Sequence, residues 1–220
     1  MKALLIGATG ATGSDLLQLL LNDVEVESVA IFVRRDPQFT HPKLEVHLID
    51  FNRPEQWRHL VKGDILFSCL GTTLRDAGSK EEQWKVDFDY QYRFAQATRE
   101  NGVEALMLVS SMNASVRSPF FYARMKGELE EAVRKLGFPE LMIFRPPSLI
   151  RKGSNRTMER VGVKVIGFFN RLGLLRSMRP MPTDQLAKAI HLAAKSDKSG
   201  EQLLEPKDIE SLAAVSVTAP

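Results

Sequence analysis

Short apolar runs recur along the first two thirds of the chain, and longer stretches with helical spacing of apolar positions separate them. Nearly continuous apolar runs are typical of strands buried on both faces, as in a parallel sheet covered by helices. The predicted strands are Lys2–Ile6, Ser28–Val33, Leu44–Ile49, Asp64–Cys69, Glu104–Val109 and Leu141–Phe144. The predicted helices are Ser14–Asn22, Pro54–Val61, Lys80–Asn101 and Phe120–Leu136. Right-handed crossovers between them predict an α/β fold with one doubly wound parallel sheet and helices on both faces.

The pattern changes after Arg145, where Pro146-Pro147 end the last of these strands. The features that follow are a basic loop at 151–156, a mixed apolar and basic stretch at 161–178, a helix at 183–195, a short run at 202–204 and a loose tail at 213–220. The mixed stretch favours a pocket wall or flap over a membrane or partner contact. We therefore expect one domain over 1–220, in which roughly 146–205 form a small substrate lobe at the carboxyl edge of the sheet.

Composition narrows the possible function classes. The 30 basic and 27 acidic residues leave a net charge of only +3, so no nucleic-acid partner is expected. The single cysteine and four scattered histidines offer no disulfide and no metal-ligand spacing. No apolar run is long enough for a transmembrane segment, and the first apolar run is too short for a signal peptide. These features predict a cytoplasmic protein.

A glycine-rich loop lies directly between the first predicted strand and the first predicted helix, with the sequence Gly7-Ala-Thr-Gly-Ala-Thr-Gly13. In a Rossmann-like fold such a loop allows a tight turn at its first glycine, close approach of a pyrophosphate at its second, and helix–strand packing at its third. The helix N-terminus adds unpaired N–H groups and a partial positive charge. The expected cofactor contacts of the loop are Gly7, Thr9, Gly10, Ala11, Thr12 and Gly13. A glycine-rich turn without a ligand is the alternative.

The end of the second strand bears on which dinucleotide is preferred. Folds that bind NAD usually place an acidic residue there to hold the ribose 2′-hydroxyl, whereas this chain has Arg34 and Arg35. A guanidinium suits a 2′-phosphate, so NADP(H) is favoured, although Asp36 leaves NAD(H) possible. The alternative is that both arginines are solvated surface residues.

Two further strand ends carry candidate cofactor contacts. Asp50 follows the third strand, where it could meet the adenine amino group or could cap the turn before Pro54. Leu70, Gly71 and Thr72 follow the fourth strand at the point where the strand order reverses, and a plain loop is the alternative there.

The candidate catalytic residues are Ser110, Ser111, Tyr122 and Lys126. The tyrosine and the lysine are four residues apart in a helical pattern, so they share one face. A neighbouring ammonium lowers the pKa of a phenol, which would make the tyrosine a general acid–base near neutral pH. The two serines end the fifth strand, where a hydroxyl could hold a substrate carbonyl oxygen. If this spacing is considered by itself, the simpler interpretation is that the tyrosine and the lysine are surface residues without a catalytic role.

Together these residues resemble the short-chain dehydrogenase/reductase superfamily in its atypical and extended branch, and more narrowly the Tat-interacting-protein type of oxidoreductase. The segments that carry the resemblance are Gly7–Gly13, Cys69–Thr73, Val86-Asp87, Leu108–Ser111, Tyr122–Glu128 and Phe144–Pro146. The resemblance implies that Tyr122 donates a proton to a carbonyl oxygen and that Lys126 also binds the nicotinamide ribose. It further implies that Ser111 orients the substrate, that Ser110 lies nearer the cofactor and that Arg156 reaches the cofactor.

The resulting expectation is an NADP(H)-dependent oxidoreductase that transfers hydride between nicotinamide and a carbonyl or alcohol substrate. One alternative is an NADPH-binding regulatory protein with little turnover, and a second is an enzyme like the sugar-nucleotide epimerases. The resemblance also makes a homodimer possible.

Overall fold

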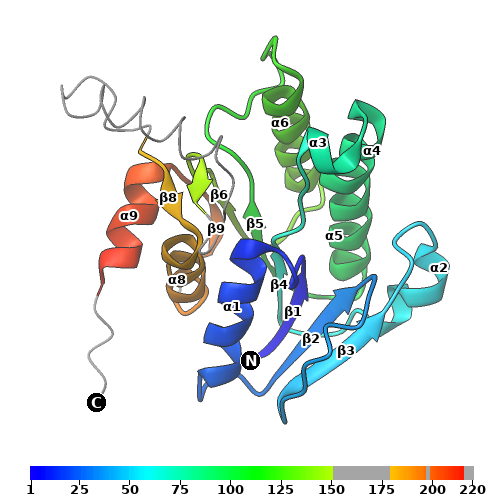
Figure 1. Cartoon of the computed structure of the whole chain (residues 1–220). Coiled ribbons are helices and arrows are strands. Elements are labelled where there is room, and N and C mark those ends of the chain that lie inside the picture. The colour runs from blue at the N-terminus through cyan, green and yellow to red at the C-terminus, as the bar shows by residue number, and fades with distance from the viewer. Residues whose placement is uncertain (151–178, 197–198, 216–220) are drawn as a thin grey trace.

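The computed structural model describes residues 1–150, 179–196 and 199–215. In these residues, seven parallel strands form one sheet in the order β3-β2-β1-β4-β5-β6-β9 (Figure 1). The strands are β1 (Lys2–Ile6), β2 (Ser28–Val33), β3 (Leu44–Leu48), β4 (Ile65–Ser68), β5 (Ala105–Val109), β6 (Glu140–Phe144) and β9 (Gly200–Leu204). A separate pair joins β7 (Leu149–Ile150) to β8 (Met181–Pro182). The predicted doubly wound Rossmann-like sheet is confirmed, and its strand order reverses between β1 and β4.

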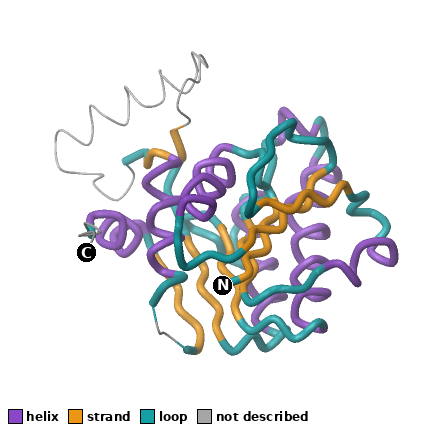
Figure 2. Tube along the Cα trace, turned by 90° about the horizontal axis from the view of Figure 1, so that it is seen from below, coloured by secondary structure: helices purple, strands orange, loops and turns teal. Residues whose placement is uncertain are grey.

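Helices cover both faces of this sheet. They are α1 (Ala11–Asn22), α2 (Pro54–Trp57), the 3₁₀ turn η1 (Arg58–Leu60), α3 (Leu74–Ala77), α4 (Lys80–Trp84), the π-helix η2 (Lys85–Tyr90), α5 (Gln91–Glu100), α6 (Phe121–Arg134), α8 (Thr183–Ala193) and α9 (Pro206–Ala214). Figure 1 shows α1 and α8 on one side of the sheet and α5 and α6 on the other, and Figure 2 shows the strands between the two helical layers from below. No helix among the described residues is long and apolar enough to cross a membrane.

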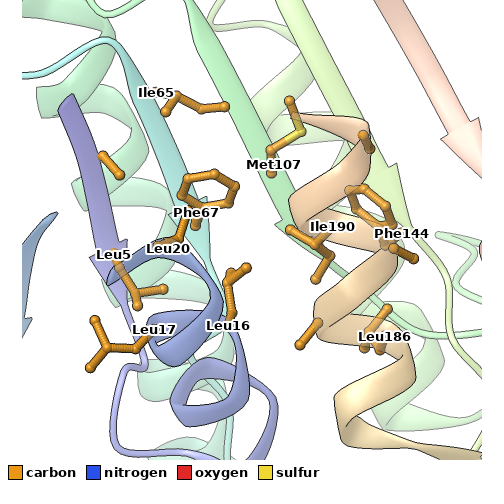
Figure 3. Packing of buried hydrophobic residues seen from close by; sticks show 14 of the residues in the cluster. Leu5, Leu16, Leu17, Leu20, Ile65, Phe67, Met107, Phe144, Leu186 and Ile190 are labelled. Carbon is orange, nitrogen blue, oxygen red and sulfur yellow. The ribbon is translucent and has the colours of Figure 1, made fainter. Parts of the chain in front are cut away.

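The apolar strands feed two separate cores because successive side chains point to opposite faces. In β1, Leu5 packs into the core beneath α1 and α8, whereas Leu4 packs into the core beneath α5 and α6. Figure 3 shows the first of these cores, in which leucines of α1 lie near Leu5 and Phe67, and Ile190 of α8 lies near Met107 and Phe144. Burial on both faces explains why the strands read as continuous apolar runs rather than as alternating ones.

Polar contacts at both ends hold α8 against α1. Near the carboxyl edge of the sheet, the Thr183 hydroxyl donates to Asp15 at 2.7 Å. At the opposite end, Asp23 Oδ2 lies 2.6 Å from His191 Nε2 and 2.9 Å from Lys195 Nζ. Burial opposes ionisation of Asp23, but the Glu25 N–H and these two side chains lower its pKa to about 2. Folding therefore favours the ionised form of Asp23. The stability that this contributes is fully present above the ordinary pKa of 3.8 and is lost as the pH falls through the lowered pKa of about 2.

The predicted elements form within a few residues of their expected ends, and the structure adds α3, α9 and the short strands β7 and β8. The predicted helix over 80–101 contains the π-helix η2, which the apolar spacing does not reveal. Helix α9 overlaps the range 213–220 that was predicted to be a loose tail. Its N-terminal signal was present, since Glu205 and Asp208 form a capping box around Pro206.

Much of the range expected to form a small lobe belongs to the main domain. Strand β9 pairs with β6 and completes the sheet, and α8 packs beside α1. The segment 151–178, on which the lobe prediction mainly depends, lies outside the described residues. The division into domain and lobe therefore stays a prediction.

Candidate active site

A cavity of about 540 Å³ opens at the carboxyl edge of the sheet, where the strand order reverses. Among the described residues, its lining comes from the loops after β1, β4, β5 and β6, from the first turns of α1, α6 and α8, and from Asp87 of η2 and Leu149 of β7. The lining residues are Gly10, Ala11, Thr12, Cys69, Leu70, Gly71, Thr72, Thr73, Asp87, Val109, Ser110, Ser111, Met112, Asn113, Tyr122, Lys126, Pro146, Pro147, Ser148, Leu149 and Thr183. The structure thus brings the glycine-rich loop and the candidate catalytic residues together around one space.

The glycine-rich loop is held in place by contacts that leave no room for side chains at two of its glycines. Gly7 has φ +82°, and a Cβ there would lie 2.4 Å from the carbonyl carbon of Cys69. A Cβ on Gly13 would lie 2.1 Å from the Gly7 carbonyl oxygen. Gly10 is different, because its nearest neighbour, that same oxygen, would be 3.2 Å away and the residue is exposed to the cavity. The first and third glycines therefore serve packing, and the second leaves space for a ligand.

The N-terminus of α1 faces the cavity without a side-chain cap. Its N-cap is Gly10, which makes no side-chain hydrogen bond, and the first turn contains no acidic residue. Ala11 and Thr12 line the cavity there, so their backbone N–H groups are at hand for an anion. An uncapped helix start with an open glycine fits the pyrophosphate of a dinucleotide.

Tyr122 and Lys126 project from the first turns of α6 toward the cavity. The Lys126 ammonium lies 5.9 Å from the centroid of the Tyr122 ring, and the tyrosine is 40% exposed whereas the lysine is buried. Desolvation of the phenol raises the pKa of Tyr122, and Asp87 adds to this rise, while Lys126 lowers it. The net direction is upward. Lys126 therefore acts on the phenol in the predicted direction, but desolvation of the phenol outweighs it.

Asp87 is the buried counter-ion of Lys126. Its Oδ1 lies 3.1 Å from Lys126 Nζ, and both side chains are almost fully buried. Burial alone would lower the pKa of Lys126, but Asp87, Tyr122 and Glu130 together outweigh it, and the net direction of the lysine pKa is upward. From the sequence, Asp87 was expected only as part of the Val86-Asp87 segment of the resemblance, without a role in the site.

The two serines at the end of β5 have different surroundings. The Ser110 hydroxyl donates to Glu130 Oε1 at 2.5 Å, and Glu130 is buried and accepts two hydrogen bonds from Arg145, at 2.6 and 3.0 Å. The Ser111 hydroxyl makes only a long contact of 3.4 Å to the Met112 carbonyl oxygen. Ser110 is therefore committed to a buried ion pair, whereas the Ser111 hydroxyl can turn to a ligand.

The loop after β4 borders the same cavity. Its Thr72 N–H donates to Asp87 Oδ2 at 2.8 Å, and its Thr72 carbonyl accepts from Gln83 Nε2 at 3.1 Å. A Cβ on Gly71 would lie 3.2 Å from Asp87 Oδ1, so the glycine makes room for the carboxylate. Burial raises the pKa of the neighbouring Cys69 thiol to about 12, so this cysteine stays a neutral thiol.

The remaining predicted cofactor contacts lie elsewhere. Arg34 and Arg35 are exposed at the end of β2, and neither makes an ion pair with another described residue. Asp50 accepts from the backbone and side-chain N–H groups of Asn52 at 2.9 and 2.8 Å, so it stabilises the turn after β3, and it does not line the cavity. Arg156 lies outside the described residues.

Comparison with known proteins adds a family. Residues 7–165 match the family described as NAD(P)H-binding. The chain is 32% identical over 203 residues to "Protein FMP52, mitochondrial" of Candida albicans, covering 89% of each chain. It is 31% identical over 225 residues to the protein of the same name in Saccharomyces cerevisiae, covering 97% of each chain.

Solved structures with the same fold include enzymes that hold NAD. MoeE5 in complex with UDP-glucose and NAD superposes with a TM-score of 0.69 at 18% identity, covering 97% of this chain and 81% of that one. The dTDP-glucose 4,6-dehydratase DesIV from Streptomyces venezuelae, with NAD bound, superposes with a TM-score of 0.68 at 17% identity. The match covers 92% of this chain and 74% of that one. At these identities the likeness shows the fold alone.

The relatives overturn one prediction. The absence of a signal peptide and of a membrane span predicted a cytoplasmic protein, but curated relatives that align over most of this chain are named mitochondrial. The cytoplasmic prediction is wrong because it considered only secretion and membrane insertion, and neither bears on import into an organelle.

Proposed function

Because the chain belongs to the NAD(P)H-binding family and shares its fold with NAD-dependent enzymes, we propose that it is an NADP(H)-dependent oxidoreductase of the short-chain dehydrogenase/reductase type. The substrate would be a small carbonyl compound or the corresponding alcohol. One observation carries this proposal: Ser111, Tyr122 and Lys126 line the same cavity as the uncapped start of α1. A binding protein without turnover has no need for a tyrosine and a lysine at that place.

A bound nicotinamide dinucleotide supplies the hydride in this chemistry, and the protein contributes position and electrostatics. The Ser111 hydroxyl donates a hydrogen bond to the carbonyl oxygen of the substrate. The Tyr122 phenol gives its proton to that oxygen as negative charge develops on it. Lys126 stabilises the phenolate that remains and holds the ribose side of the cofactor. Ser110 supports the end of β5 through Glu130.

Consumption of NADPH in the presence of a panel of aldehydes, ketones and quinones tests this function. The expected result is that at least one carbonyl compound accelerates the loss of NADPH absorbance and yields the alcohol in equal amount. A folded protein that binds NADPH but consumes none with any member of the panel would favour the regulatory alternative. The resemblance to the Tat-interacting-protein type favours an NADPH-binding regulatory protein as the main alternative, so the assay is designed to distinguish turnover from binding alone.

A sugar-nucleotide epimerase is the second candidate, and the observation in its favour is the fold shared with MoeE5, solved with UDP-glucose and NAD, and with a UDP-N-acetylglucosamine 4-epimerase. Such an enzyme returns the hydride to its substrate, so a UDP-hexose would change configuration without net change in the cofactor. A carbonyl reductase consumes one NADPH for each alcohol formed. Product analysis with UDP-glucose therefore distinguishes the two reactions.

Replacement of both Arg34 and Arg35 by alanine should weaken NADPH binding by about tenfold or more, a free-energy difference of about 1.4 kcal/mol, and leave NADH binding unchanged. The reason is that only NADPH carries the 2′-phosphate that an exposed guanidinium at the end of β2 would pair with. Fluorescence titration with each reduced cofactor measures both affinities. Arg93→Ala removes an exposed arginine from α5 and serves as the matched control. An equal loss of affinity for NADPH and NADH would contradict the assignment of these arginines to the 2′-phosphate. Asp36 would then be the candidate that sets the cofactor preference.

The names of the relatives support a mitochondrial location for this chain. A tagged copy expressed in yeast should then be recovered with purified mitochondria.

A further inference from the structure

Asp87 is a buried charge for which the proposed mechanism has no use. It lies in the π-helix η2, and π-turns within longer helices occur frequently at functional sites. Gln91 Nε2 donates to the Asp87 carbonyl at 2.8 Å, and Ser68 donates to Gln91 Oε1 at 2.8 Å. The surrounding polar groups thus support the irregular turn, and the turn brings a carboxylate to the wall of the cavity.

The two oxygens of this carboxylate bind different parts of the site. Oδ2 accepts the Thr72 N–H at 2.8 Å, which fixes the loop after β4. Oδ1 pairs with the Lys126 ammonium at 3.1 Å. Gly71 permits this approach, because a Cβ there would lie 3.2 Å from Oδ1. A single residue therefore joins the loop expected to touch the cofactor to the lysine expected to assist proton transfer.

The groups that favour the charged form of Lys126 come from two elements. Asp87 of η2 has the largest effect of these groups on the lysine pKa, and Tyr122 and Glu130 act from α6 itself. Glu130 is already paired with Arg145, so Asp87 is the carboxylate that pairs with the Lys126 ammonium.

We propose that Asp87 is a positioning residue that holds Lys126 and the Gly71-Thr72 backbone in one arrangement and sets the pH at which the Tyr122–Lys126 pair loses its first proton. The proposal rests on the proposed function only for its consequence in catalysis, because the contacts exist without a substrate. Electrostatics determines the direction of the expected pH shift. A nearby carboxylate disfavours phenolate and favours ammonium, so removing its charge makes the first proton leave at lower pH.

Asp87→Asn tests this with little change in shape. The asparagine oxygen can still accept the Thr72 N–H, but the counter-ion of Lys126 is gone. We expect the phenolate of Tyr122 to form at a pH lower by about one unit or more, the shift typical of a close charge. Ultraviolet titration detects the phenolate, and subtraction of the same titration in a Tyr122→Phe background isolates this tyrosine from the other two. The measurement needs no substrate, so it remains informative even if the protein shows no turnover.

Asp89→Asn is the matched control, because it removes the same charge from the same π-helix at a half-buried residue outside the cavity lining. It should leave the titration of Tyr122 within about 0.3 unit of the parent, since a charge that is not in contact is screened by solvent. If the oxidoreductase function holds, the pH–rate profile of Asp87→Asn moves in the same direction as the titration.

Gly71→Ala provides a second variant if Asp87→Asn fails to fold. Its methyl group would press on Oδ1 and weaken the ion pair without changing any charge, so the phenolate should again form at lower pH, with a smaller shift. An unchanged or raised pKa of Tyr122 in Asp87→Asn would overturn the proposal. An equal shift in Asp89→Asn would also overturn it, because the effect would then be one of net charge rather than of position.

Discussion

Tyr122→Phe should lower the rate of carbonyl reduction by about 100- to 10,000-fold, the usual contribution of a general acid. The phenyl ring keeps the packing beside Lys126, whose ammonium lies 5.9 Å from the ring centroid, and only the proton donor is lost. The affinity for NADPH should therefore stay within about threefold of the parent, a difference below about 1 kcal/mol. Steady-state NADPH consumption and fluorescence titration measure the two quantities on the same preparation.

Tyr92→Phe is the control for this substitution. Tyr92 stacks on Phe88, with ring centroids 6.0 Å apart, and it does not line the cavity, so its hydroxyl should not affect the rate. Parental turnover in Tyr122→Phe would show that another group donates the proton, and the reaction assigned to this cavity would have to be replaced.

Gly13→Ala should destabilise the protein by more than about 4 kcal/mol or prevent it from folding, which is exceptional for a single methyl group. The added Cβ would lie 2.1 Å from the Gly7 carbonyl oxygen and 2.7 Å from its carbonyl carbon. Both neighbours are backbone atoms between β1 and α1, so relief requires moving the helix off the sheet. Urea denaturation followed by circular dichroism measures the change in the free energy of unfolding.

Gly10→Ala separates the two uses of glycine in this loop. Gly10 has φ −79° and its Cβ would meet only the Gly7 oxygen, at 3.2 Å, so the cost in stability should be below about 1 kcal/mol. The methyl group would instead occupy the space next to the cavity, and NADPH binding should weaken. Parental stability of Gly13→Ala would contradict the packing role of the third glycine.

Asp87 shows what local sequence reasoning misses. The apolar spacing over 80–101 predicts one regular helix, and in a regular helix nothing marks Asp87 as facing the sheet edge. The π-helix between α4 and α5 changes the direction in which this carboxylate points, and only its contacts with Thr72 and Lys126 reveal the result. The clue available in the sequence was the resemblance, since Val86-Asp87 is one of the segments that carry it.

The two serines give a second example. The resemblance implied that Ser111 orients the substrate and that Ser110 lies nearer the cofactor, but the residues by themselves did not decide which hydroxyl is available to a substrate. The answer depends on Glu130 and Arg145, which lie 20 and 35 residues further along the chain than Ser110. The Glu130–Arg145 ion pair captures one hydroxyl and leaves the other.

The sequence by itself determined the parallel sheet, its covering helices and the place of the glycine-rich loop. These features depend on short-range patterns: apolar runs, helical spacing and glycines at fixed intervals. The tertiary structure alone decided the direction of the Tyr122 pKa and the engagement of Ser110. It also decided that β9 and α8 complete the main domain. The physical reason is that electrostatic and packing energies depend on distances between residues that are remote in sequence, and folding alone sets those distances.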